Sequence, residues 1–575
     1  MRPSSFRSLI LALGCAALLG CSPMARSSMS GVADRRAPSR AGPLAIDVTE
    51  LTAEQVQKDY AAQKYTAVQL TQAYLDRIAQ YEAVYNAFIS MNPRALEIAA
   101  ELDAEYRRSG PRGPLHGVPI VIKDNLDYGG LVTTAGYSGF SKATGGIDMI
   151  PDDDAAAVER MRKAGAIVLG KTNLPDFAGD GTRSKSTVAG ATRNATDVNR
   201  APGGSSGGTA TAVNASFAVL GLGTETGGSI ENPASSQGLV GLKPTFGLVP
   251  LDGVVPIDAT YKDVVGPIAR SVRDAATVLD VLAGPTNEDL ATYASVGKTP
   301  ASGYAAALDP NALRGKRFGL VGLGWRSQFL PLAPETEQLY RKAIEALKAQ
   351  GAEVVEDPFA GTGFREVYSR QPRVPSVGAH DMLVYFMGLG PKAAFHSQQD
   401  WEKLTGRRFR GENNNRGGGD SAAAGAAGGR GAAGAAARPP AQPTAVYATE
   451  EGDAYGAWRM EIRAIYRKVL TDNKLDGFFF PQAGGPIRPF IEDPARPDYS
   501  PNNHPELPSN IINDIGAPVL TLPMDYYADG MPFNVAFMGD LWSEPQLIGY
   551  AYAAEQATKA RRAPMLITRL PDTTR

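Results

Sequence analysis

Residues 203–208 read Gly-Gly-Ser-Ser-Gly-Gly, and residues 224–229 read Thr-Glu-Thr-Gly-Gly-Ser at the end of an apolar run. A third stretch, residues 118–123, reads Val-Pro-Ile-Val-Ile-Lys and is typical of a short buried strand that ends in a lysine. Glycine lets the backbone approach other groups closely, and successive backbone N–H groups in such loops can hold a developing oxyanion. Hydroxyl groups and a lysine together can supply a nucleophile and a base. The three stretches therefore predict a catalytic site.

Strand and helix patterns alternate outward from these stretches. A capping box at Thr66–Gln69 predicts a helix that follows it, and Gly165 is expected to end a helix over 155–164. Further elements are expected at strands 118–122, 166–169, 217–220, 318–321, 354–355, 478–480 and 519–522, and at helices 336–350 and 545–562. This alternation predicts an α/β fold, in which one large domain over 47–570 has a mixed β-sheet core covered by helices on both faces.

Composition narrows the possible functions. The 575 residues are 43% hydrophobic and 21% charged, which is ordinary for a globular protein, and the net charge of −2 argues against non-specific nucleic-acid binding. Both cysteines, Cys15 and Cys21, precede the predicted domain, and the four histidines lack metal-ligand spacing. We therefore expect no metal, no cofactor and no nucleic-acid partner.

The first 21 residues have the pattern of an export signal. Arg2 and Arg7 precede the apolar stretch 9–19, which is shorter than the ~20 residues that a membrane-spanning helix needs. Leu18-Leu-Gly-Cys21 resembles a bacterial lipobox, which implies lipidation of Cys21; a plain cleaved signal with an incidental cysteine is the alternative. Residues 22–46 are then a flexible tether, and the protein is predicted in the bacterial cell envelope, as a periplasm-facing lipoprotein or, without the lipid, a periplasmic or secreted protein.

Residues 411–445 differ from the rest of the chain. An Asn-rich start is followed by Gly/Ala repeats, which offer too little apolar surface for a packed structure. Strand and helix patterns resume afterwards, so the segment is predicted to be a disordered surface insertion within one domain.

Two stretches of the sequence match the letters of well-known catalytic or nucleotide-binding motifs. Residues 165–172 match the phosphate-binding string GxxxxGK[ST], but a predicted helix precedes the string and a predicted strand lies inside it, which is the wrong context. Residues 204–208 match the GxSxG nucleophile turn, which requires a strand before the turn and a histidine base. The approach to this turn is polar, so a histidine triad is the weaker interpretation and stays open.

The remaining pattern is more specific, because several separate motifs occur together. The two Ser/Gly stretches, the lysine strand in 117–125, Gly-Leu-Lys-Pro-Thr-Phe-Gly at 241–247 and the closing segment 537–558 together resemble the amidase signature family, over roughly residues 50–565. The closing segment is most similar to peptide amidases.

The resemblance implies a role for each matching residue. Ser229 would be the nucleophile, Ser205 the bridging serine behind a cis Gly204–Ser205 peptide bond, and Lys123 the general base. Ser206 would support its neighbour. The backbone N–H groups of an oxyanion hole would come from Thr226, Gly227, Gly228 and Ser229. Because a base must be neutral, Lys123 is expected in a desolvated place.

Two positions depart from the family pattern. Glu231 stands where many relatives have Arg, and Glu225 occupies a position that is often Asp. The usual Asp–Arg support of the serine loop therefore cannot form as such.

The predicted function is an exported serine hydrolase that cleaves linear carboxylic amides to carboxylate and ammonia or an amine, with C-terminal peptide amides as a candidate substrate. A membrane association is expected through the lipid anchor. Two alternatives stay open: a catalytically impaired amide-binding lipoprotein, suggested by Glu231, and one component of a tRNA-dependent amidotransferase, which the export signal disfavours.

Overall fold

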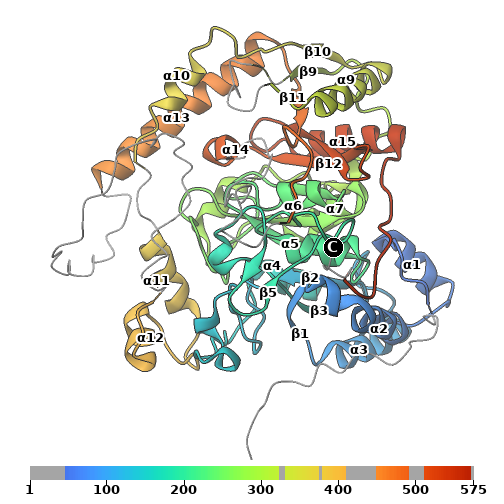
Figure 1. Ribbon diagram of the computed structural model, residues 1–575, viewed down its shortest axis with the longest axis vertical. Coiled ribbons are helices and arrows are strands. Elements are labelled where there is room, and N and C mark those ends of the chain that lie inside the picture. Colours follow the sequence, from blue (N-terminus) through green and yellow to red (C-terminus); the bar gives the residue numbers. More distant parts are fainter. Residues whose placement is uncertain are drawn as a thin grey trace, which may run out of the picture. The chain divides into compact units, whose positions relative to one another are not determined.

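Lys123 ends an interior strand, the third from one edge, of a large mixed β-sheet (Figure 1). The computed structural model describes residues 46–320, 322, 331–373, 378–409, 449–490 and 510–570, and these belong to one compact unit of the chain. In this described part the main sheet has 11 strands. In sheet order they are β1 (Phe88–Met91), β3 (Ile167–Thr172), β2 (Pro119–Lys123), β6 (Leu220–Glu225), β8 (Val264–Ala269), β7 (Val240–Lys243), β12 (Val519–Tyr526), β13 (Pro532–Met538), β11 (Gly477–Pro481), β9 (Arg317–Leu320) and β10 (Glu353–Val355).

The sheet combines parallel and antiparallel pairs. β2 runs parallel to both β3 and β6, and β9 runs parallel to β10 and β11, whereas the strands between β6 and β11 pair antiparallel. A separate two-stranded ribbon joins β4 (Lys185–Ser186) and β5 (Gly190–Ala191). The predicted α/β domain with a mixed sheet is confirmed.

Helices surround this sheet (Figure 1). They are α1 (Ala53–Ala61), α2 (Ala67–Tyr85), α3 (Ala95–Ser109), α4 (Ala156–Lys163), α5 (Gly207–Asn214), α6 (Glu231–Ser236), α7 (Val272–Leu282), α9 (Pro334–Ala349), α10 (Phe364–Ser369), α11 (Gly378–Gly388), α12 (Gln398–Thr405), α13 (Glu450–Asp472), α14 (Asn510–Ile515) and α15 (Glu544–Thr558). None of the helices in the described ranges has the length and apolar character to cross a bilayer.

Local sequence signals account for several boundaries. Thr66 accepts from the backbone of Gln69 while the Gln69 side chain accepts from the backbone of Thr66, so the predicted capping box starts α2. The predicted strand–helix–strand unit is present as β9, α9 and β10, with β9 and β10 directly paired.

Several predicted boundaries were wrong; for example, β3 ends at Thr172 rather than 169, and β12 ends at Tyr526 rather than 522. The strand expected to begin at Phe217 begins at Leu220. The last helix ends at Thr558 rather than Arg562, because Lys559 adopts a left-handed conformation with φ of 45° and Arg561 turns away to pair with Glu50 at 2.8 Å. The sequence pattern placed Arg561 in the last turn of this helix, but in the structure Arg561 forms a long-range ion pair with Glu50 instead.

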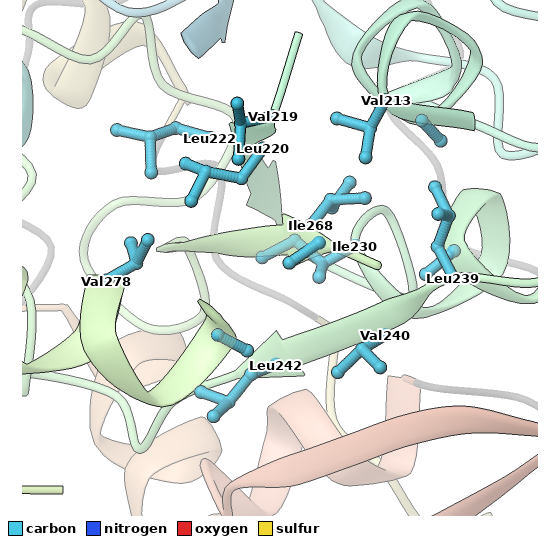
Figure 2. Packing of buried hydrophobic residues seen from close by; sticks show 14 of the residues in the cluster. Val213, Val219, Leu220, Leu222, Ile230, Leu239, Val240, Leu242, Ile268 and Val278 are labelled. Carbon is cyan, nitrogen blue, oxygen red and sulfur yellow. The ribbon is translucent and has the colours of Figure 1, made fainter. Parts of the chain in front are cut away.

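A buried apolar cluster lies where β6, β7 and β8 pack against α5 and α7 (Figure 2). Its members come from strands and helices alike, and they include Val213, Val219, Leu220, Leu222, Leu239, Val240, Leu242, Ile268 and Val278. Ile230, the residue directly after Ser229, is fully buried in the same cluster. The core thus anchors one end of the predicted nucleophile turn.

The predicted signal at 1–21 with Cys21, the tether up to residue 45 and the insertion at 411–445 lie outside the described residues.

Candidate active site

Strand order brings the catalytic candidates to one edge of the sheet. In the parallel pair of β2 and β6, Ile122 lies opposite Leu222, so Lys123 and Thr224 both lie near the carboxyl ends of neighbouring strands. Ser205 and Ser206 directly precede α5, and Ser229 follows the end of β6 before α6 begins. Since α5 packs against both β2 and β6, the two Ser/Gly stretches meet at this edge.

Lys123 and Ser205 are in direct contact. The Nζ atom of Lys123 donates to Ser205 Oγ at 2.7 Å, to Thr224 Oγ1 at 2.9 Å and to the Thr224 carbonyl oxygen at 3.3 Å. Asn125 Nδ2 donates to the same Thr224 hydroxyl at 3.0 Å and so braces it. The lysine is therefore fixed toward Ser205 by bonds on several sides.

Burial makes Lys123 a candidate base. The side chain is fully buried, and this desolvation lowers the pKa of Lys123 to about 7, although the negative charges of Asp263 and Glu225 act in the opposite direction. A substantial fraction of the amine is therefore neutral near pH 7, as a proton acceptor requires. The expected desolvated surroundings of this lysine are confirmed.

The peptide bond between Gly204 and Ser205 is cis, as the resemblance implied. A Cβ atom at Gly204 would lie 2.5 Å from the Asp180 carbonyl oxygen, which explains why only glycine fits there. The hydroxyl of Ser206 accepts from the Thr224 backbone N–H at 3.3 Å and donates to the Thr224 carbonyl at 3.2 Å. Ser206 therefore ties the Gly204–Ser205 loop to β6.

The Ser229 turn lies beside this loop. The backbone N–H of Ser206 donates to the Ser229 carbonyl oxygen at 3.2 Å. The side chain of Ser229 is 8% exposed, and its hydroxyl makes no hydrogen bond within the described ranges. The structure thus joins Lys123 to Ser205 directly and brings Ser229 next to them through the backbone, without a bond between the two serine hydroxyls.

The backbone N–H groups of residues 226–229 have no acceptor among the described residues. Thr226 and Gly227 are partly exposed, and Gly228 has a φ of 104°, a conformation that favours glycine. Successive amides that lack acceptors and border solvent can donate to an oxyanion. This turn is the place predicted for the oxyanion hole.

The sequence pattern did not identify Asp263, whose carboxyl group holds Thr226 of the serine turn in place. The Thr226 hydroxyl donates to Asp263, whose other oxygen accepts from the backbone of Ile257 and Asp258, both at 2.9 Å. Burial raises the pKa of Asp263. Asp263 lies at the end of a polar stretch without a motif, so no local signal identified it.

Other contacts stand in place of the Asp–Arg pair that supports the serine loop in many relatives. Glu225 Oε2 accepts from the backbone N–H groups of Ile230 at 2.8 Å and Glu231 at 3.2 Å. Asn513 Nδ2 donates to Glu225 Oε1 at 3.0 Å, and Gln482 Nε2 donates to Glu231 Oε2 at 3.0 Å. The serine turn is therefore supported by the carboxyl groups that flank it, and amide groups from distant parts of the chain contact these carboxyl groups.

The alternative motifs fit the structure less well. The phosphate-loop string overlaps the buried strand β3, where Lys171 pairs with Asp124 at 3.1 Å. His116 Nε2 lies 3.2 Å from the Leu102 carbonyl and His396 Nε2 2.8 Å from that of Gly390, whereas Lys123 contacts Ser205. In the described ranges no three His, Cys, Asp or Glu residues are grouped to hold a metal ion.

Comparison with known proteins gives the class. The amidase family model matches residues 69–374. The chain is 30% identical over 519 residues to a component of the glutamyl-tRNA(Gln) amidotransferase of Alkaliphilus metalliredigens, and the match covers 89% of this chain and 97% of that protein. It is 34% identical to the crystal structure of peptide amidase from Stenotrophomonas maltophilia, with a TM-score of 0.69 and coverage of 90% and 99%. A peptide amidase in complex with the competitive inhibitor chymostatin is 33% identical, with a TM-score of 0.71 and the same coverage.

The fold and these relatives define an amide-hydrolysing enzyme. The chain belongs to the amidase family.

Proposed function

We propose that this chain hydrolyses linear carboxylic amides through an acyl-enzyme on Ser229. The observation that carries the proposal is the buried Lys123 amine at 2.7 Å from Ser205 Oγ, beside a turn whose four N–H groups lack an acceptor in the described part of the chain. These are the groups that a base, a proton relay and an oxyanion site require, and this supports the proposal.

The reaction has two halves. Ser229 Oγ attacks the amide carbon while its proton passes through Ser205 to the neutral Lys123 amine, and the N–H groups of residues 226–229 hold the tetrahedral oxyanion. The carbon–nitrogen bond then breaks as the proton returns through Ser205 to the leaving nitrogen, so that ammonia or an amine departs. Water attacks the acyl-enzyme by the same relay, which releases the carboxylate and restores the Ser229 hydroxyl.

C-terminal peptide amides are the proposed substrates. Support comes from the two peptide amidase structures at 33% and 34% identity, which match nearly the whole length of those enzymes. We also propose that the enzyme is exported and anchored through a lipid on Cys21, on the basis of the lipobox-like sequence at 18–21.

The test is ammonia or amine release by the purified chain from amidated dipeptides, short aliphatic amides, anilides and fatty amides. Amidated dipeptides should be the best substrates, and Ser229→Ala should remove activity on all of them. A fluorophosphonate should label the parent on Ser229, as peptide mass spectrometry would show, and should leave Ser229→Ala unlabelled. A parent that takes no label and hydrolyses no amide would favour the impaired binding protein.

A second candidate function is that of an amidotransferase component, because a relative at 30% identity carries that name. Hydrolysis of peptide amides by the isolated chain would count against it. Ammonia release confined to free glutamine would favour it.

A further inference from the structure

Two buried carboxyl groups, those of Glu225 and Glu231, flank the Ser229 turn in the sequence. Glu225 is the last residue of β6 and Glu231 is the first residue of α6, and their exposed fractions are 1% and 0%. Glu225 receives three N–H groups: those of Ile230 and Glu231 on Oε2, and the Asn513 amide on Oε1. Glu225 therefore bridges both sides of the turn by accepting three hydrogen bonds.

Glu231 has different surroundings. Its Oε2 accepts from Gln482, but its Oε1 is buried without a hydrogen-bond donor among the described residues. The carboxyl groups of Glu231 and Glu225 also interact with each other, and Glu225 Oε2 accepts from the Glu231 backbone N–H at 3.2 Å. Two carboxylates in contact inside a protein repel each other, and an unsatisfied buried anion is costly. A proton on Glu231 removes both problems, because the acid can then donate to Glu225.

The other charged groups nearby do not cancel this effect. Lys243 on β7 is fully buried, and its Nζ donates to the carbonyl oxygens of Pro244 at 2.9 Å and Ala517 at 2.8 Å. Burial lowers the pKa of Lys243. Two further charged groups act on Lys243 as well: the carboxyl of Glu544 raises its pKa, and the guanidinium of Arg459 lowers it. Burial first, and then the negative charge of Glu225, raise the pKa of Glu231 well above its ordinary value, although Lys243 acts in the opposite direction.

We propose that Glu231 is a positioning residue that keeps its proton and donates it to Glu225, so that Glu225 remains the anionic brace of the Ser229 turn. The inference rests on the proposed role of Ser229. Loss of the Glu231 proton at alkaline pH places a second negative charge against Glu225. The two carboxyl groups then separate, the N–H groups of Ile230 and Glu231 lose their acceptor, and turnover falls.

The decisive variant is Glu231→Gln, because the amide has nearly the size of the acid and donates to Glu225 at every pH. Turnover on an amidated dipeptide should rise with pH as in the parent, since Lys123 is untouched. The fall at alkaline pH should move upward by more than one pH unit or disappear. The melting-temperature difference between Glu231→Gln and the parent should grow in favour of the variant from pH 5 to pH 8, because only the parent must hold a proton against rising pH.

Glu555→Gln is the matched control. Glu555 is a half-buried carboxyl on α15, and it accepts from the Val272 backbone away from the serine turn. Its replacement should alter the pH dependence of stability and leave both limbs of the activity profile in place. A Glu231→Gln enzyme with the parental alkaline limb and a pH-independent melting difference overturns the proposal, as does a variant that fails to fold. Activity that survives in Ser229→Ala refutes the nucleophile instead, and leaves the melting comparison intact as a separate result.

Discussion

A single buried amine decides the chemistry at the scale of residues. Lys123 lies at the end of an aliphatic strand, where a lysine usually extends its amine to solvent. Here β3 and β6 flank that strand on both sides, so the amine stays inside and meets Ser205. The sequence pattern alone fits both outcomes, and only the neighbouring Ser/Gly stretches favour the catalytic one.

The pH dependence of activity tests this lysine. The pKa of Lys123 lies at about 7, and the base is the neutral form, so turnover of the parent should rise from acidic pH through neutrality, before the alkaline fall that the Glu231 proposal predicts. Lys123→Ala should lower turnover by about 10²–10⁴-fold, the usual loss for a general base, and should lack the rising limb in its residual activity. Initial rates between pH 5 and pH 9 on one amide would measure both effects.

Lys123→Arg is the matched control, because arginine keeps a positive charge at all working pH values and cannot accept the proton. It should be as inactive as Lys123→Ala. Near-parental turnover in either variant, together with loss of activity on replacement of a histidine, would support the histidine-triad alternative instead.

At the scale of elements, continuous motifs were predictable and the groups that support them were not. The stretches at 118–123, 203–208 and 224–229 each combine several informative residues, and hydrogen bonds join them at the site. Asp263, Gln482 and Asn513 reach the same place from the residue before β8, the residue after β11 and α14. Each is a single polar residue in an ordinary context, so its role depends on strand pairing and helix packing that no local pattern encodes.

The insertion at 411–445 provides a prediction at this scale. Its Gly/Ala composition offers few apolar side chains for burial, and the closure entropy of a loop changes slowly with length. Deletion of residues 413–440 should therefore leave turnover within about twofold of the parent and the melting temperature nearly unchanged. Thermal unfolding and initial rates of the two proteins would measure this, and a fall of several degrees would show that the segment packs against the domain.

At the scale of the whole molecule, the predicted export signal at 1–21 is separate in sequence from the predicted catalytic domain at 47–570. Both cysteines, at 15 and 21, come before residue 46, where the described part of the chain begins. The catalytic candidates all lie in this domain, between residues 123 and 229. Lipidation would therefore determine where the enzyme acts and would leave its chemistry unchanged.

Replacement of Cys21 tests this separation. A thioether to lipid forms only on a cysteine, and the acyl chains then hold the protein on a bilayer, each buried methylene contributing about 0.8 kcal/mol. Cys21→Ala should consequently appear in the aqueous phase of a detergent partition, with the mass of an unlipidated chain and with parental turnover. Cys15→Ala, which leaves the lipobox cysteine in place, should partition with the membrane as the parent does. Membrane partition that is identical for Cys21→Ala and the parent would refute the lipid anchor. If the membrane also retains neither protein, a plain cleaved signal is the better interpretation.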